Sequence, residues 1–174
     1  MATNVAFEIL YREYYVRVFG LCRRLLTSPP MAEDATQETF MKAYRSFEKY
    51  DTSQPFWQWI ASIANNHCID VLRRQKKTKN LFGEEEQETI EPGAEEQPLL
   101  TEVISSEESS QLTEAISALP DKYRIPLVLA YFYDASYERI ASELSISTSH
   151  VGVLILRAKQ RLREKLGDNS ELAP

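Results

Sequence analysis

The stretch SYERIASELSISTSHVGVLILRAKQRL, residues 136–162, decides the fold of the C-terminal part of this chain. Ser136 is a favourable N-cap, and the amphipathic run that follows it ends at Leu144. A polar turn, 145–147, interrupts the pattern, and a longer helical run begins at Thr148. Two helices joined by so short a turn predict a helix-turn-helix, whose second helix suits the major groove of DNA.

The second helix of this motif has two predicted sides. Apolar residues three and four apart predict a buried side formed by Val151, Ile155, Ala158 and Leu162. The opposite side carries Gly152, Leu156, Gln160 and Arg161 and leads to a basic end, which can hold phosphates or be a solvated helix terminus. We expect the motif to contact DNA through Ser136, Thr148, Ser149, His150, Val153 and Arg157.

Further helical patterns lie on both sides of this motif. Before it, apolar runs around Leu112–Leu119 and Ile125–Phe132 are separated by Pro120. In the first part of the chain, three-and-four spacing predicts helices over Phe7–Leu25, from near Met31 to Phe47, and over Phe56–Arg74. No long alternating run indicates a sheet, so the predicted fold is all-α.

Charge divides the chain into three parts. Residues 1–79 carry 12 basic and 8 acidic residues, residues 80–110 carry 10 acidic and no basic residues, and residues 111–174 are balanced at 8 of each. The middle segment also has few large apolar side chains, a composition typical of chains that do not fold alone. We therefore expect two small helical domains, 1–79 and 111–174, joined by a flexible acidic linker, 80–110.

The third predicted helix combines aromatic, amide and basic side chains, which is the mixture that binds unpaired bases and their phosphates. The candidate residues are Phe56, Trp57, Asn65, Asn66, Arg73 and Arg74. Periodicity places Trp59 in the core and makes Trp57 the better candidate for exposure. The alternative is that both tryptophans are core residues and the basic run is a frayed helix end.

The second predicted helix has a polar side opposite Phe40 and Phe47. This side includes Asp34, Gln37, Glu38, Lys42 and Arg45. Such a stripe is typical of a solvated face or of a surface that binds another protein.

Composition excludes several classes of protein. The chain has 174 residues, 43% of them hydrophobic, which suffices for folded cores. No apolar run of about 20 residues predicts a membrane span, and the N-terminus does not resemble an export signal, so we expect a cytoplasmic protein without membrane insertion. Cys22 and Cys68 lie in apolar patterns and are expected to be reduced, packed thiols. No motif indicates catalysis, a metal or a cofactor.

Two groups of motifs resemble a known family. The run AEDATQETFMKAYR, residues 32–45, followed by WIASIANN, 59–66, and DVLRR, 70–74, resembles the second conserved region of extracytoplasmic-function (ECF) sigma factors. The run LPDKYR, 119–124, with SYERIA, 136–141, and RAK, 157–159, resembles their fourth region. The resemblance covers both predicted domains in the right order.

This resemblance implies a transcription initiation factor with no chemistry of its own. Asp34, Gln37, Glu38 and Lys42 would bind the β′ clamp helices of core RNA polymerase, and the β flap is a second implied contact on the polymerase. The third helix would melt and capture the −10 element, and the helix from Thr148 would read the −35 element. The acidic linker would enter the RNA exit path. An anti-sigma factor is a further implied partner.

The chain departs from many relatives at two places. Gly152 and Leu154 stand where many relatives have Lys or Arg in the recognition helix, and Ser62 and Asn65 stand where many have Arg in the melting helix. These departures suggest a weaker hold on phosphates, a promoter that is read through other positions, or ordinary divergence. Two other functions remain to be weighed: a helix-turn-helix activator that does not replace the sigma subunit, and a nucleic-acid enzyme, for which the sequence offers little material.

Overall fold

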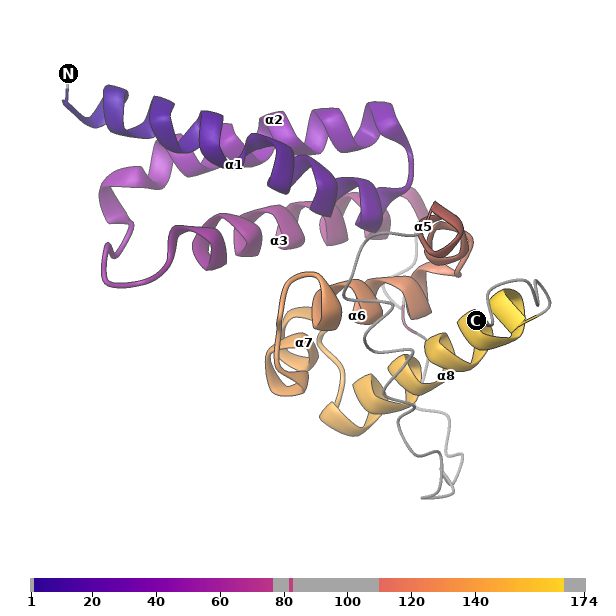
Figure 1. The fold of residues 1–174 in the computed structure, drawn as a ribbon. Coiled ribbons are helices and arrows are strands. Elements are labelled where there is room, and N and C mark those ends of the chain that lie inside the picture. Colours follow the sequence, from indigo (N-terminus) through magenta and orange to yellow (C-terminus); the bar gives the residue numbers. More distant parts are fainter. Residues whose placement is uncertain (1, 77–81, 83–109, 168–174) are drawn as a thin grey trace. The chain divides into compact units, whose positions relative to one another are not determined.

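The computed structural model describes residues 2–76, 82 and 110–167, and the regular structure within them is helical (Figure 1). The all-α prediction is therefore confirmed. The chain divides into two compact units, residues 1–79 and residues 80–174. Nearly all of the predicted acidic linker, 80–110, lies outside the described residues.

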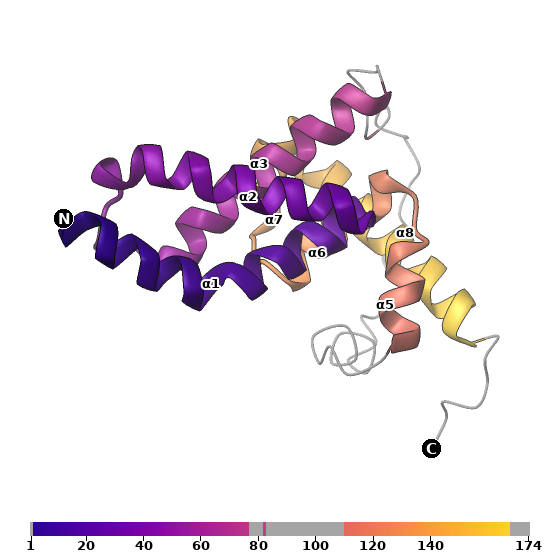
Figure 2. The ribbon, with the colours of Figure 1, turned by 90° about the horizontal axis from the view of Figure 1, so that it is seen from above.

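The first unit is a bundle of three helices, α1 (Ala2–Leu26), α2 (Pro29–Ser46) and α3 (Phe56–Lys76), with a short 3-10 helix, η1 (Phe47–Lys49), after α2. Each of the three α-helices packs against the other two (Figures 1 and 2). The α2 helix begins at Pro29, two residues before the predicted start, because proline is tolerated in the first turn, where its missing N–H has no intrahelical partner.

The core of this bundle is apolar but contains two threonines. Its largest fully buried side chains include Leu21 and Leu25 of α1 and Ile60 and Ile69 of α3. The Thr36 and Thr39 hydroxyls of α2 are also fully buried, and each donates a 2.7 Å hydrogen bond to the backbone carbonyl four residues earlier. These bonds satisfy hydroxyls that would otherwise destabilise the core.

Cys22 and Cys68 meet inside the bundle. Both are buried free cysteines, as predicted, and the two thiols share a hydrogen bond between α1 and α3. That hydrogen bond, together with burial, raises the pKa of Cys68 well above its ordinary value. The same hydrogen bond lowers the pKa of Cys22, although burial opposes that shift. Cys68 therefore stays a protonated, packed thiol at neutral pH.

The second unit contains α5 (Ser110–Ser117), α6 (Asp121–Tyr131), α7 (Tyr137–Leu144) and α8 (Thr148–Gly167). The α8 helix packs against each of the other three. Its core includes Leu127, Ile140, Leu144, Ile155 and Leu162.

The start of α6 is held by a buried arginine. One Nη atom of Arg124 donates to the Leu119 carbonyl at 2.8 Å, and the other pairs with the Asp121 carboxylate at 2.5 Å. The guanidinium thereby joins the loop at residue 119 to the first turn of the helix. This contact gives a structural reason for the LPDKYR motif of residues 119–124.

Candidate nucleic-acid interface

The predicted helix-turn-helix is present, and its turn and helix starts are defined by serines. The Ser136 hydroxyl accepts a hydrogen bond from the backbone N–H of Arg139 at 3.2 Å, which caps α7. Ser145 ends α7 in the left-handed conformation, with φ of 57°. The Ser147 hydroxyl then accepts from the His150 N–H at 3.1 Å and caps α8. The chain thus turns sharply between two helices.

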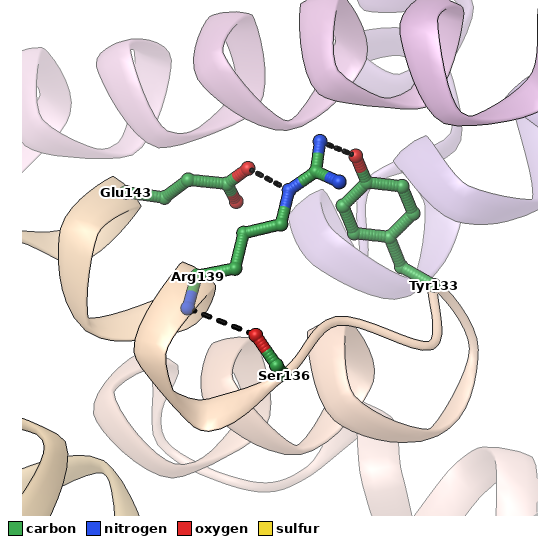
Figure 3. Close-up of polar contacts among 4 residues, drawn as sticks. All are labelled: Tyr133, Ser136, Arg139 and Glu143. Carbon is green, nitrogen blue, oxygen red and sulfur yellow. Dashed lines mark hydrogen bonds and ion pairs between the residues drawn. The ribbon is translucent and has the colours of Figure 1, made fainter. Parts of the chain in front are cut away.

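An arginine fixes α7 against the preceding loop (Figure 3). The Arg139 Nε pairs with Glu143 Oε1 at 3.2 Å, and an Nη atom donates to the Tyr133 hydroxyl. The Arg139 guanidinium also lies 5.0 Å from the centre of the Tyr133 ring. Burial raises the pKa of Glu143, although its contact with Arg139 opposes the shift. This network holds the first helix of the motif in place.

The α8 helix has a buried and an exposed side, but the boundary differs from the predicted one. Val151, Ile155, Ala158 and Leu162 are buried as predicted. His150 and Leu154 are also buried, because they continue the line of Ala158 and Leu162 at intervals of four residues. His150 therefore lies in the core and not on the outward side of the helix where it was expected, and Leu154 is a core residue as well.

The remaining predicted contacts of the motif are accessible. Ser136, Thr148 and Ser149 are exposed, and Val153 and Arg157 are half-buried on the outward side of α8. Gly152 and Leu156 are also half-buried on this side. A continuous strip of α8 is therefore open to a partner.

Basic side chains surround Tyr123 of α6. They come from Lys122 on the same helix and from the middle of α8. The Lys122 ammonium lies 4.9 Å and the Arg161 guanidinium 4.7 Å from the centre of the Tyr123 ring. Burial alone would raise the pKa of Tyr123, but hydrogen bonds from Lys122 and Arg157, with the charge of Arg161, lower it below its usual value. This positive cluster favours a nearby phosphate.

The exposed side of α3 carries a line of polar side chains at intervals of four residues. Only some of the residues predicted to contact the −10 element lie on it. Asn66 and Arg74 are exposed and Arg73 is half-buried. The spacing of four residues extends this line through Gln58 and Asp70, which were not predicted from the sequence, and through Ser62, which was noted only as a departure from relatives. A regular four-residue interval between polar side chains was the signal that could have found them.

Asn65 does not lie on that line. Its side chain is fully buried, and neither amide atom has a hydrogen-bond partner among the described residues. Asn65 therefore lies in the core and not on the surface where it was expected, because one step along a helix turns a side chain by about 100° and moves it from the surface of the bundle into its core.

The aromatic residues of α3 are more enclosed than predicted. Phe56 is buried, at 7% exposed, and does not lie on the surface where it was expected. Trp57 is half-buried, with the Arg17 guanidinium 3.9 Å from its ring centre and Tyr14 stacked on it at 6.5 Å. Trp59 is also half-buried and packs on Tyr50 at 4.8 Å, so the predicted contrast between a core Trp59 and an exposed Trp57 is not found.

The polar face of α2 divides into two parts. Asp34 and Gln37 are exposed. Glu38 and Lys42 are half-buried and turn toward α3, where the Lys42 ammonium lies 3.1 Å from Nδ1 of His67. Burial and the charge of Lys42 lower the pKa of His67. The exposed part of the face therefore includes Asp34 and Gln37 near one end of α2 and Arg45 near the other.

An apolar groove runs along residues 37–45 of α2. It has a volume of about 580 Å³ and lies between α1 and α2, lined by Phe7, Tyr11, Gln37, Phe40, Met41, Tyr44 and Arg45. Met41 and Tyr44 are each 49% exposed. The sequence analysis missed both, although large apolar side chains beside a polar stripe indicate a surface that binds protein.

The described part of the chain lacks two other kinds of feature, a metal-binding cluster and a membrane-spanning helix. Its His, Cys, Asp and Glu side chains form no group of three or more that could hold a metal ion. No helix in that part is long and apolar enough to cross a bilayer.

Comparisons with known proteins agree with this arrangement. The family model of Sigma-70 region 2 matches residues 10–78, and that of Sigma-70 region 4 matches residues 109–162. The ECF RNA polymerase sigma factor SigW of Bacillus subtilis is 33% identical over 168 residues, which cover 94% of this chain and 90% of SigW. SigM of the same organism is 32% identical over 88% of this chain and 91% of SigM.

Solved structures share the fold. The sigma factor RpoE of Bartonella quintana, determined in complex with the anti-sigma factor NepR, matches with a TM-score of 0.61 and 18% identity over 93% of this chain and 97% of RpoE. CnrH, determined in complex with the cytosolic domain of CnrY, matches with a TM-score of 0.55 and 21% identity over 95% of this chain and 90% of CnrH.

The fold and the exposed surfaces define a two-unit helical protein with a DNA-binding helix-turn-helix. The two family matches and the similarity to SigW identify it further: the chain belongs to the ECF sigma factors of the sigma-70 family. These are transcription initiation factors, which bind core RNA polymerase and direct it to promoters.

Proposed function

We propose that the two units of this ECF sigma factor share promoter recognition. The first unit, residues 1–79, binds core polymerase and the opened −10 element, and the second unit docks on the −35 element through its helical part, residues 111–174. The observation that carries this proposal is the pairing, in one chain, of an exposed polar line on α3 with an open recognition helix, α8. The intervening acidic segment, 80–110, is a linker that enters the RNA exit path.

The proposed −10 surface is the polar line of α3. Asn66 offers an amide for the edge of an unpaired base, and Arg73 and Arg74 offer charge for its phosphates. Trp57 is half-buried and is adjacent in sequence to Gln58, the first residue of this line. Phe56 and Asn65 support the helix from inside and do not contact DNA.

The proposed −35 surface is the outward strip of α8 with the starts of both helices of the motif. Hydroxyls of Ser136, Thr148 and Ser149 are placed for phosphate contacts near helix N-termini, where N–H groups favour anions. Arg157 adds charge farther along the strip. Val153 faces the base edges.

The proposed polymerase surface is the exposed end of α2. Asp34 and Gln37 would contact the β′ clamp helices, with the groove between α1 and α2 beside them, and Glu38 and Lys42 would support them from the α3 side. The second unit would bind the β flap. We propose no catalytic activity and no cofactor for the chain itself.

An anti-sigma factor is the proposed regulatory partner. Val5, Ile9 and Val16 are 60%, 59% and 78% exposed and share one side of α1, since they are four and seven residues apart. Apolar side chains so exposed favour a protein partner. An anti-sigma factor that covers α1 and the neighbouring groove would prevent polymerase binding.

Reconstituted transcription tests the function. Core polymerase with this chain is expected to start RNA at discrete sites on a library of genomic fragments, and core polymerase alone is not. A gel shift without polymerase separates this function from that of an independent activator. Equal promoter affinity with and without polymerase, or no new start sites, would contradict the proposal.

A further inference from the structure

The recognition helix lacks the side chains that usually read guanine and adenine. Its first nine residues, 148–156, contain no Lys, Arg, Asn, Gln, Asp or Glu. His150 is the remaining polar ring in this stretch, and it is buried. Guanine is recognised mainly by Arg or Lys, and adenine by Asn or Gln, so this part of α8 cannot form those paired hydrogen bonds.

What this part of α8 exposes is apolar or small. Thr148, Ser149, Gly152, Val153 and Leu156 lie along its accessible side. The ring of Tyr137, which is 37% exposed, lies over Gly152, with its Cε2 3.9 Å from the position that a Cβ would take there. Together Tyr137, Gly152, Val153 and Leu156 form an apolar strip across α7 and α8.

Thymine is the base that suits such a strip. In the major groove it alone presents a methyl group, at C5, and apolar side chains contact this group. The positive side chains lie beyond the strip, from Arg157 onward, where they can hold phosphates without competing for base edges. The apolar strip of α8 therefore suits thymine methyl groups in the major groove. The positive residues that follow it suit the phosphates of the DNA backbone at the edge of that groove.

We propose that Val153 and Leu156 select the −35 element of this sigma factor by contacting the C5-methyl groups of thymines. The inference rests on the proposed function of α8 as the −35 helix. It adds the chemical basis of selection: methyl contacts in place of paired hydrogen bonds to guanine.

Uracil in place of thymine tests the proposal, because it removes the methyl group and keeps every hydrogen-bonding group of the base. The holoenzyme first selects duplexes from a library with a randomised upstream window, and the selected −35 window is then synthesised with deoxyuridine at each thymine in turn. We expect binding to fall about fourfold for each contacted methyl. The measurement needs no protein variant.

Two protein variants test whether Val153 and Leu156 cause the difference in binding between thymine and uracil. Val153→Ala and Leu156→Ala should each reduce the difference between thymine and uracil at one position of the window. Ser142→Ala, an exposed change on α7 outside the strip, should keep the full difference. Circular dichroism checks that each variant is folded.

The possible outcomes are distinct. Selected windows in which guanine dominates, or binding equal with thymine and uracil, would overturn the methyl contacts while leaving α8 as the −35 helix. A difference that persists unchanged in both alanine variants would also overturn the assignment. Selection that enriches no upstream window, with start sites nonetheless specific, would contradict the proposed function of α8 itself.

Discussion

At the scale of single residues, Asn65 is the most informative position of the first unit. Its amide is fully buried and unpaired among the described residues, whereas the adjacent Asn66 is exposed. An unpaired buried amide costs about 1 to 3 kcal/mol, which exceeds the loss from a small cavity. Burial of Asn65 is therefore a weakness of the bundle rather than a source of its stability.

We predict that Asn65→Ala raises the free energy of unfolding by about 1 kcal/mol, since it removes the unpaired amide and improves helix propensity. Urea denaturation measures this change. Asn66→Ala is the matched control, and it should alter stability by no more than about 0.5 kcal/mol. A loss of stability in Asn65→Ala would mean that the amide forms hydrogen bonds in the core.

His67 links α2 to α3 and gives a prediction about pH. Its pKa lies below the usual 6.5, because of burial first and the charge of Lys42 second; Glu38 and Asp70 oppose this shift and Arg74 adds to it. The unfolded chain then binds the proton more tightly than the folded one. Stability from this residue is present above pH 6.5 and is lost as pH falls through the lowered pKa.

We therefore predict that acidification from pH 7.5 to 5.5 lowers the free energy of unfolding of the native protein by more than it lowers that of the His67→Gln variant. Urea denaturation at each pH gives the comparison, and an NMR titration of the imidazole gives its pKa directly. Parallel pH profiles for the two proteins, or a His67 pKa above 6.5, would contradict the prediction.

At the scale of secondary-structure elements, α2 presents two different surfaces. Asp34 and Gln37 face solvent, and Glu38 and Lys42 face α3. A charge change at Glu38 would therefore combine a packing effect with an interface effect. Asp34 is exposed, so a charge change there tests the interface without a packing effect.

We predict that Asp34→Arg weakens binding to core polymerase by about tenfold or more, because a reversed charge replaces attraction by repulsion at a complementary surface. Co-purification and fluorescence titration measure the binding. Glu33→Arg, which introduces the same charge change at the neighbouring exposed position, should have a much smaller effect. Equal losses in both variants would indicate long-range electrostatics instead of a contact through α2.

At the scale of the whole molecule, the two units should fail in different ways. The α3 surface acts on an unpaired strand, and α8 meets intact duplex before the strands separate. Opening the duplex costs a few kcal/mol per base step. A variant that captures the open strand poorly should therefore recover when the DNA is opened in advance. A variant that docks poorly on the upstream duplex should not recover.

We predict that a promoter mismatched across its −10 region rescues transcription by Asn66→Ala more than transcription by Arg157→Gln. The amide of Asn66 stabilises the opened state, which the mismatch supplies in advance, whereas Arg157 serves the upstream duplex. Open-complex formation on matched and mismatched templates measures the rescue. Equal rescue of both variants, or of neither, would mean that the units do not divide the work in this way.

The sequence by itself determined the helical class, the helix-turn-helix and the family. These depend on local signals: apolar spacing of three and four, serine caps, prolines at helix starts, and motifs in a fixed order. Tertiary structure decided which polar and aromatic residues are accessible. Two pairs of adjacent polar residues show this, Asn65 with Asn66 and Ser149 with His150. Packing against α1 and α2 buries Asn65 and leaves Asn66 exposed, and packing against α6 and α7 buries His150 and leaves Ser149 exposed. A helix rotates by about 100° per residue, so a small shift in the buried sector exchanges a surface contact for a core side chain.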